Sequence, residues 1–301
     1  MSGAGGGPGL ADLQPGDPRL GPVERRSKIL GSMRAEGAKG VAIATISTIV
    51  VVIVIVVAIV RSPNWPEFKQ FFFNGEEFRR TFPDILRAFL RNIEYFLIAE
   101  PIILALALLL AVMRSLPGPV FFPIRLMATI FIDGFRGIPT ILVIYLLGFG
   151  IPALQIPGLP TSQIFWALVG LILSYSAYVA EVYRAGIESV HPSQSAAARS
   201  LGLTRFQTLR FVVIPQAVRR VIPPLLNDFI ALQKDTALIA VVAGAVPEAF
   251  LEGQIYQAAD FNMTPIVGVA LCFLVITIPM ARLTDRVVAR QRARRQAGAS
   301  L

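Results

Sequence analysis

The chain alternates long apolar runs with short polar connections. Six of these runs reach the length of about 20 residues that a helix needs to cross the hydrocarbon of a bilayer. They lie at residues 41–60, 92–113, 126–147, 165–183, 209–233 and 265–283. The pattern therefore predicts an all-α polytopic membrane protein with about six transmembrane helices.

The composition agrees with this fold class. Hydrophobic residues make up 54% of the chain and charged residues 16%, whereas charged residues are about a quarter of an average soluble domain. The single histidine, His191, and the single cysteine, Cys272, exclude a metal centre built from several ligands of these types. We therefore expect no metal site, and we expect Cys272 to be a small core residue.

Five parts follow one another along the chain. Residues 1–40 are rich in Gly and Pro and then basic, which predicts a disordered cytoplasmic tail. Residues 41–60 are expected to be an extra N-terminal transmembrane helix, because the run is too long for the apolar core of a signal peptide and no cleavage motif follows it. Residues 61–88 are expected to be an extracytoplasmic loop, with a surface helix within it as an alternative. Residues 89–285 form the main transmembrane domain, and residues 286–301 a basic cytoplasmic tail.

Basic residues gather in the connections on one side of the predicted bundle. They occur in both tails and in the connections 114–125 and 186–210, whereas 150–164 carries no charge and 248–260 carries only acids. The positive-inside rule assigns the basic connections to the cytoplasm. We therefore expect both termini to be cytoplasmic and the protein to lie in the cell membrane. The 61–88 connection fits less well, with five basic and four acidic residues.

The polar connection between the fourth and fifth runs contains a two-helix pattern at residues 193–207, which we call the elbow. Ser193 is a favourable N-cap for about two turns of helix, and Gly202 stands where a left-handed residue ends such a helix. Thr204 and Gln207 have the spacing of a capping box that opens a second helix. The elbow is expected in the cytoplasm, where its small residues suit docking of another protein.

Three functions compete to explain this pattern. A helix-turn-helix DNA reader has a similar layout, but the elbow lies between two spans, and Phe206, Leu209 and Phe211 stand where base-reading polar residues are needed. A secondary transporter would use an intramembrane acid such as Glu100 as a proton relay. It needs no elbow, and the sequence shows no internal repeat. A transport subunit driven by a separate ATPase accounts for the elbow in a chain that has no Gly-rich phosphate-binding loop.

Several blocks of the sequence resemble the permease subunits of ATP-binding-cassette (ABC) importers, in the branch for polar amino acid uptake. That family reads roughly AY-x-x-E-x-x-R-x-x-I, a loop with G-Q-x-E-A-A-x-x-L-G, then I-x-L-P-Q-A and K-D-T-S-L, with F-R-G-T-P upstream. The likeness covers about residues 85–285 and keeps the order of the blocks. The identical or conservatively replaced residues are Phe135, Arg136, Gly137, Pro139, Ala177, Tyr178, Glu181, Arg184, Ile187, Gln194, Ala197, Ala198, Leu201, Gly202, Val212, Ile214, Pro215, Gln216, Ala217, Pro224, Asn227, Lys234, Asp235, Thr236 and Leu238.

The chain departs from this family at three positions. Ala196 replaces the Glu that names the EAA motif, Ser193 replaces the preceding Gly, and Ala237 stands where Ser is usual. The missing carboxylate would weaken an ionic contact with the ATPase, while the small residues that set the docking shape are retained. We therefore expect coupling to survive. The first span and the long N-terminal tail are additions to the five-span core of the family.

The resemblance implies a permease transmembrane domain at residues 89–285 and two sets of motif residues within it. The residues implied in coupling to the ATPase are Gln194, Ala196, Ala197, Ala198, Leu201 and Gly202. The structural family motif comprises Glu181, Arg184, Pro215, Lys234, Asp235 and Thr236. We expect Glu181 and Arg184 to fix the angle at which the chain leaves the membrane toward the elbow, and Lys234 and Asp235 to form an ion pair or cap.

The resemblance also implies partners. They are ABC ATPase subunits that use ATP and Mg, a second permease subunit, and an extracytoplasmic binding protein that delivers glutamate, glutamine, aspartate or a basic amino acid. The lipid bilayer surrounds the chain, and no nucleic acid is expected. In such an assembly the chain itself is not an enzyme and binds no cofactor.

Polar side chains within the apolar runs are costly and mark function by default. Our candidates for the substrate pathway are Glu100, Arg136, Asn227 and Asp228. An acid at Asp228 would favour the ammonium group of an amino acid or a basic side chain. Two alternatives stay open, since Glu100 could be a packing partner and Arg136 could pair with Asp133 at the i, i+3 spacing of one helix.

Overall fold

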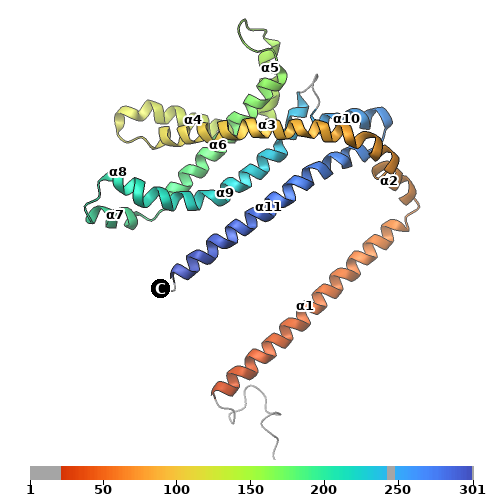
Figure 1. Cartoon of the computed structure of the whole chain (residues 1–301), viewed down its shortest axis with the longest axis horizontal. Coiled ribbons are helices and arrows are strands. Elements are labelled where there is room, and N and C mark those ends of the chain that lie inside the picture. The colour runs from red at the N-terminus through yellow and green to blue at the C-terminus, as the bar shows by residue number, and fades with distance from the viewer. Residues whose placement is uncertain (1–21, 243–247, 300–301) are drawn as a thin grey trace, which may run out of the picture. The chain divides into compact units, whose positions relative to one another are not determined.

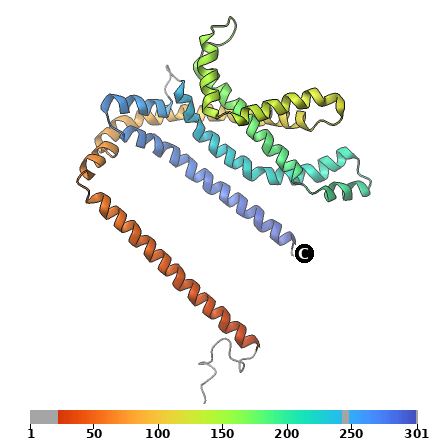
Figure 2. The same ribbon diagram turned by 180° about the vertical axis from the view of Figure 1, so that it is seen from behind.

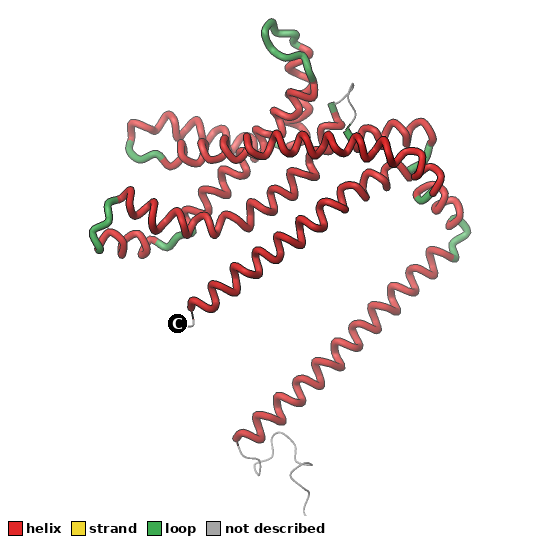
Figure 3. The backbone as a smooth tube through the Cα atoms, in the orientation of Figure 1, coloured by secondary structure: helices red, strands yellow, loops and turns green. Residues whose placement is uncertain are grey.

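Helix is the only regular secondary structure in the part of the chain that the computed structural model describes, residues 22–242 and 248–299 (Figure 3). The chain divides into two units, residues 1–68 and 69–301. Figures 1 and 2 show the helices from opposite sides.

The first unit consists mainly of one long helix, α1 (Pro22–Val60). Its apolar stretch Gly40–Val60 is long enough to cross a membrane, and its side chains are exposed. The helix begins within the stretch for which the sequence predicts a disordered tail, so that prediction is wrong from Pro22 onward. Residues 22–40 are rich in helix-favouring Arg, Lys, Glu, Leu, Met and Ala, and proline is well suited to a first helical position. Residues 1–21 lie outside the described part of the chain.

The stretch predicted as an extracytoplasmic loop, residues 61–88, is mostly helical. It contains the short helix α2 (Trp65–Phe72) and the first turns of α3 (Gly75–Ser115). Asn74 caps α3, and its side-chain oxygen accepts hydrogen bonds from the N–H groups of Glu76 at 3.0 Å and Glu77 at 3.2 Å. The prolines suggested a loop, but one lies in the first turn of α2 and another is accommodated inside α3. The predicted span at residues 92–113 lies within α3.

The run predicted as one span, residues 126–147, is broken into α4 (Phe122–Gly137) and α5 (Thr140–Ala153), which are bent by 102° to each other. In Figure 1, α5 leaves the end of α4 in a new direction. The break falls before Pro139, where Ile138 is extended. A proline disfavours helical conformation in the preceding residue, and this explains why α4 stops there.

Three long helices follow in the second unit. They are α6 (Gln163–Glu188), α9 (Ile214–Asp235) and α11 (Thr264–Ala299). Among the described residues, four helices are long and apolar enough to cross a membrane, or five spans if the bent pair α4–α5 counts as one. The predicted fifth run corresponds to α9, which does not meet that test and carries Arg219, Arg220, Asp228 and Lys234. The count is thus close to the predicted six.

The connection after α9 also differs from the predicted loop at residues 248–260. A 3-10 turn, η4 (Thr236–Val241), follows α9 directly, and α10 (Ala249–Asp260) is a helix capped by Glu248. The run FLEGQIYQAA lacks proline, and its acidic cap suits the positive end of a helix. The acids of this connection therefore lie at the cap of α10 and within it.

The core of the second unit lies around α6, which contacts α3, α4, α5 and α9. Its main cluster takes alanines from α3 and larger aliphatic residues from α5 and α6, such as Ile144 and Leu171. Small residues permit close approach of the helices. A Cβ on Gly170 would lie 3.1 Å from the Cα of Ile144, and one on Gly186 would lie 2.0 Å from the Cγ2 of Val221.

Candidate functional site

The elbow consists of two short capped helices joined by a left-handed glycine. The first, α7 (Pro192–Ser200), is followed by Gly202 with φ +86°. The N–H of Gly202 donates to the carbonyl of Arg199 at 3.0 Å, and the N–H of Leu203 donates to that of Ala198 at 3.2 Å. These two bonds form a Schellman motif, which closes a helix through a left-handed residue. The predicted turn at Gly202 is therefore confirmed.

Of the two helix caps predicted in the elbow, the second is confirmed and the first is wrong. The Thr204–Gln207 capping box is present, with both hydrogen bonds formed, at 3.2 and 2.9 Å, at the start of α8 (Arg205–Thr208). The prediction that Ser193 is the N-cap is wrong, because α7 begins at Pro192 and His191 is its N-cap. The imidazole of His191 accepts a hydrogen bond from the N–H of Ser193 at 3.2 Å. Proline at the first helical position fixes the start two residues earlier than expected.

The elbow presents an exposed surface on which most of the proposed coupling residues lie. Ala198 is buried, at 6% exposure, while the other five are exposed: Gln194, Ala196, Ala197, Leu201 and Gly202. Leu201 keeps 81% of its surface. Exposed apolar side chains on a rigid turn are typical of a docking surface. The Gln216 amide donates to the Gln194 side chain at 3.4 Å, so α7 is tied back to α9.

A π-helical turn, η3 (Leu209–Val213), joins the elbow to α9. Such turns widen a helix locally and are frequent at functional sites. Val213 packs with Val190 and Ala217 in a small apolar cluster next to the elbow. Pro215, of the family motif, stands in the first turn of α9, where its missing N–H is tolerated. The elbow therefore leads into a membrane helix through a defined apolar joint.

Glu181 of α6 is the centre of a cluster that we call the Glu181 hub. Its carboxylate accepts from the Nε of Arg184 at 2.9 Å and from the Nη1 of Arg114 at 3.1 Å, and the Nη1 of Arg136 lies 3.8 Å away. Arg184 also pairs with Glu188. Glu181 and Arg184, which were expected to act together, are thus paired, while the suggested pairing of Arg136 with Asp133 is wrong. The hub joins α3, α4 and α6.

Two of the candidate pathway residues, Glu100 of α3 and Asp228 of α9, form what we call the acid pair. Their carboxyl groups interact electrostatically, and both residues are half-buried. The Asp228 Oδ2 is buried and has no hydrogen-bond partner among the described residues. The other candidates lie differently, since Asn227 is exposed on α9 and Arg136 joins the hub.

Lys234 and Asp235 do not form the predicted ion pair within the described residues. The Asp235 carboxylate accepts instead from the phenol of Tyr175 on α6 at 2.8 Å, and Lys234 is exposed. Asp235 makes no side-chain cap for η4. The motif residue Asp235 thus ties the end of α9 to α6.

Thr236, the last residue of that motif, belongs to a fully buried cluster that we call the Asn92 network. The Asn92 amide donates to Thr236 at 3.1 Å and to Glu248 at 2.8 Å, and its oxygen accepts from the N–H of Ala249 at 3.0 Å. The Glu248 carboxylate also caps α10, accepting from Phe250 and Leu251. Asn92, Thr236 and Glu248 each have 0% exposure.

Glu248 precedes α10, outside the candidate spans. Burial raises the pKa of its carboxyl group, and the hydrogen bonds from Phe250, Asn92 and Leu251 offset part of that rise. Asn92, Glu248 and Arg114 could not be found from the sequence, because their partners are distant in the chain. A single signal was available for Glu248, an acid immediately before a helix.

The sequence matches a known family over most of its length. Residues 42–293 match the family described as "Binding-protein-dependent transport system inner membrane component". The chain is 32% identical over 208 residues to the "Probable amino-acid permease protein YxeN" of Bacillus subtilis (strain 168), covering 68% of this chain and 90% of that protein. It is 35% identical over 179 residues to the "Probable glutamine ABC transporter permease protein GlnM" of the same strain, covering 58% and 78%.

Solved structures agree with this assignment. One, described as "Crystal structure of an amino acid ABC transporter with histidines", superposes with a TM-score of 0.62 at 30% identity and covers 69% of this chain and 94% of its own. An inward-facing MetNI methionine ABC transporter superposes with a TM-score of 0.55 at 17% identity over 69% and 95%, which supports the fold alone. The chain therefore belongs to the family of binding-protein-dependent transport system inner membrane components, the multi-pass membrane permease subunits of ABC transporters.

Proposed function

We propose that the chain is the permease subunit of an ABC importer that takes up a polar amino acid. The relatives named above are amino-acid or glutamine permeases, which supports this substrate class. An extracytoplasmic binding protein would deliver the amino acid, and a second permease subunit would complete the pathway. ATP and Mg would be used by separate ATPase subunits, so the chain itself binds no cofactor and is not an enzyme.

The observation that carries the proposal is the exposed, doubly capped elbow between two membrane helices. The Schellman turn and the capping box hold its two helices in a fixed relation. A rigid surface of small and apolar residues suits a groove on an ATPase subunit, and the apolar joint with α9 offers a route for movement into the membrane. Ala196 is exposed there, so the ATPase would bind through shape and apolar contact in place of a glutamate.

The acid pair supports a more specific proposal about the substrate. Two half-buried carboxyl groups that interact electrostatically favour a cation near them. The ammonium group of an amino acid, or a basic side chain, supplies that charge. We assign Glu100 and Asp228 to the pathway on this ground, with Asn227 as a neighbouring polar group.

The orientation follows from the charges of the connections. Both termini and the elbow would lie in the cytoplasm, with residues 61–88 and α10 toward the outer face, and the protein would lie in the cell membrane. The domain plan is an extra first span at residues 41–60, a permease domain at residues 89–285 and a basic tail at residues 286–301.

Replacing Gly202 tests the elbow. Gly202 has φ +86°, and among the described residues no atom beyond its own chain neighbours lies within 4 Å of the place that a Cβ would take. Gly202→Asp therefore strains the turn and adds charge to the docking surface without a clash. We expect uptake to be lost and ATP hydrolysis to be uncoupled from substrate, while the protein still inserts in the membrane. The matched control is Gly158→Asp, which has φ +88°, the same open space and a place outside the elbow. Wild-type uptake by Gly202→Asp would show that the elbow does not couple.

A further inference from the structure

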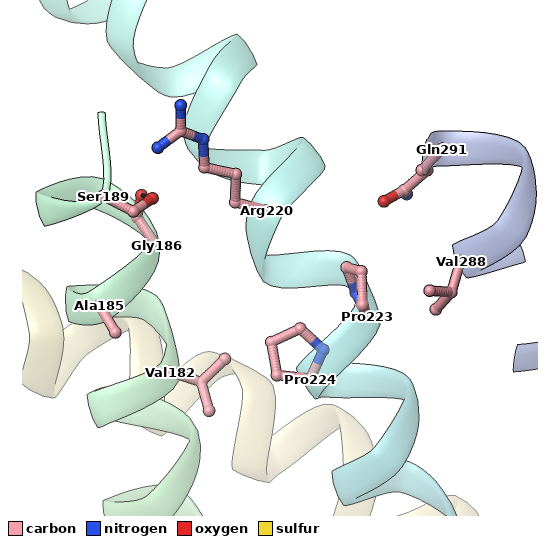
Figure 4. A pocket seen from close by; sticks show the side chains of 9 residues that line it. All are labelled: Val182, Ala185, Gly186, Ser189, Arg220, Pro223, Pro224, Val288 and Gln291. Atoms are coloured by element: carbon pink, nitrogen blue, oxygen red, sulfur yellow. Dashed lines mark hydrogen bonds between the residues drawn. The ribbon is translucent and has the colours of Figure 1, made fainter. Parts of the chain in front are cut away.

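A pocket of about 450 Å³ lies between α6, α9 and α11 (Figure 4). The helices α6 and α9 pack closely beside the pocket, because a Cβ on Gly186 of α6 would strike Val221 of α9. The residues that line it are Val182, Ala185, Gly186, Ser189, Arg220, Pro223, Pro224, Val288 and Gln291. None of these residues belongs to the acid pair or to the elbow.

The pocket lies where the spans end on the elbow side. Ser189 follows the last residue of α6 directly, and α7 begins three residues later. Val288 and Gln291 lie on the part of α11 beyond the apolar run that ends at residue 283. The pocket therefore lies beside the ends of the membrane helices, where we expect lipid headgroups.

The lining combines one cation with apolar walls. Arg220 is the only charged residue among those that line the pocket, is half-buried, and makes no ion pair within the described residues. The Gln291 Oε1 is buried without a hydrogen-bond partner among those residues, and Figure 4 shows this amide directed toward α9. Ser189 donates to the carbonyl of Gly186 at 2.6 Å, which leaves its oxygen free to accept.

These groups define the chemistry of a ligand. Arg220 suits an anion, ideally a phosphate or carboxylate. Gln291 and Ser189 offer acceptors for a hydroxyl or ammonium group beside that anion, and the prolines and valines suit an aliphatic body. A phospholipid has all three parts, with its phosphate between the polar terminal group and the aliphatic body, and basic pockets between membrane helices at the headgroup level bind lipid headgroups.

We propose that this pocket binds the headgroup of a phospholipid, with its phosphate on Arg220 and its polar terminal group on Gln291 and Ser189. The lipid would come from the leaflet on the elbow side of the membrane. It would fill the space between α6, α9 and α11 next to the helix ends that lead to the elbow. The inference is independent of the transported substrate.

Native mass spectrometry of the full-length chain, purified with the subunits that accompany it, tests the proposal. The probe is phosphatidylglycerol, titrated into the detergent-solubilised protein. We expect Arg220→Gln to retain lipid about tenfold more weakly, because a charge-assisted hydrogen bond is lost. The matched control, Arg219→Gln, removes the neighbouring exposed arginine, which does not line the pocket, and should retain lipid as the wild type does.

A second variant and a competitor make the test decisive. Ala185→Phe fills the pocket from an exposed position and keeps Arg220, so it should also weaken retention, even if Arg220→Gln fails to fold. Excess glycerol 3-phosphate should not displace the lipid. Equal retention by Arg220→Gln and Arg219→Gln, unchanged retention by Ala185→Phe, or displacement by glycerol 3-phosphate would each overturn the lipid assignment.

Discussion

The Glu181 hub and the Asn92 network are two polar clusters that join helices, and they differ in how much water reaches them. The side chains of the hub keep between 21% and 38% of their surface, whereas the three residues of the network keep 0%. The hub has one carboxylate for several guanidinium groups. In the network, every hydrogen-bonding group of the Asn92 side chain has a partner.

Because of this difference, we expect the hub to tolerate movement between its helices and the network to hold its helices in place. In the hub, water can take the place of a lost partner, and one arginine can stand in for another, so α3, α4 and α6 can shift relative to one another at modest cost. In the network, a lost partner leaves a buried group without a hydrogen bond. We therefore expect α10 to stay fixed to α3 while the helices at the elbow end move during transport.

The largest effect is expected for Glu248→Ala. The change leaves the buried Asn92 amide and the partly buried N–H groups of Phe250 and Leu251 without their acceptor. We expect a loss of about 3 kcal/mol in the free energy of unfolding, measured by denaturation in detergent. Glu252→Ala, on the same helix, is the control and should stay near wild type. A loss for Glu248→Ala no greater than that of the control would contradict the fixed joint.

A smaller effect is expected for Glu181→Gln. The change removes the anion shared by Arg114, Arg136 and Arg184, but solvent reaches all of these groups. We expect a loss of about 1 kcal/mol in the same measurement, together with altered transport. Arg136→Gln should cost less, because the 3.8 Å pair is the longest in the hub. If Glu181→Gln destabilised the protein as much as Glu248→Ala, the contrast between the clusters would fail.

A pH series probes the charge inside the network. The pKa of Glu248 is raised in the folded protein by burial, so the folded state binds the proton more tightly than the unfolded chain. Its contribution therefore makes stability fall as the pH rises from the ordinary carboxyl range through the folded pKa. The wild type should lose more stability over that interval than Glu248→Gln, which cannot titrate. Parallel pH profiles of the two proteins would contradict the assignment.

The smallest effect is expected for Arg87→Ala. Arg87 pairs with Asp84 one turn away, with 78% and 41% of the two side chains exposed. Such a pair contributes within about 0.5 kcal/mol, so the unfolding curve should barely move. This variant sets the baseline of a solvated ion pair against which the hub is judged. A loss comparable to that of Glu181→Gln would mean that the hub is an ordinary surface pair.

What the sequence could predict follows from how local each feature is. The Gly202 turn, the Thr204–Gln207 box and the Glu181–Arg184 pair were predictable because each is set within a few residues. The network was not, since Asn92 and Glu248 are separated by 156 residues and meet only when α10 packs on α3.

The break between α4 and α5 was likewise not predictable from the local sequence. Hydrophobic periodicity located the membrane helices, but it did not reveal the 102° bend between α4 and α5. That bend depends on the conformation of Ile138 before Pro139, and prolines elsewhere in the chain stand inside continuous helices. Whether a proline breaks a helix is decided by the neighbours that can satisfy the freed carbonyl groups, which the local sequence does not specify.

Uptake into sealed vesicles tests the central claim, that a separate ATPase drives this permease through the elbow. The vesicles would hold the chain with its ATPase subunits, its binding protein outside and ATP within. They would be prepared in the same sodium-free buffer on both sides, and a labelled polar amino acid would be added with a protonophore to remove any proton gradient. We predict that uptake continues with ATP and stops when ATP is replaced by a non-hydrolysable analogue. Loss of uptake on adding the protonophore, with ATP intact, would contradict the account and favour an ion-driven carrier.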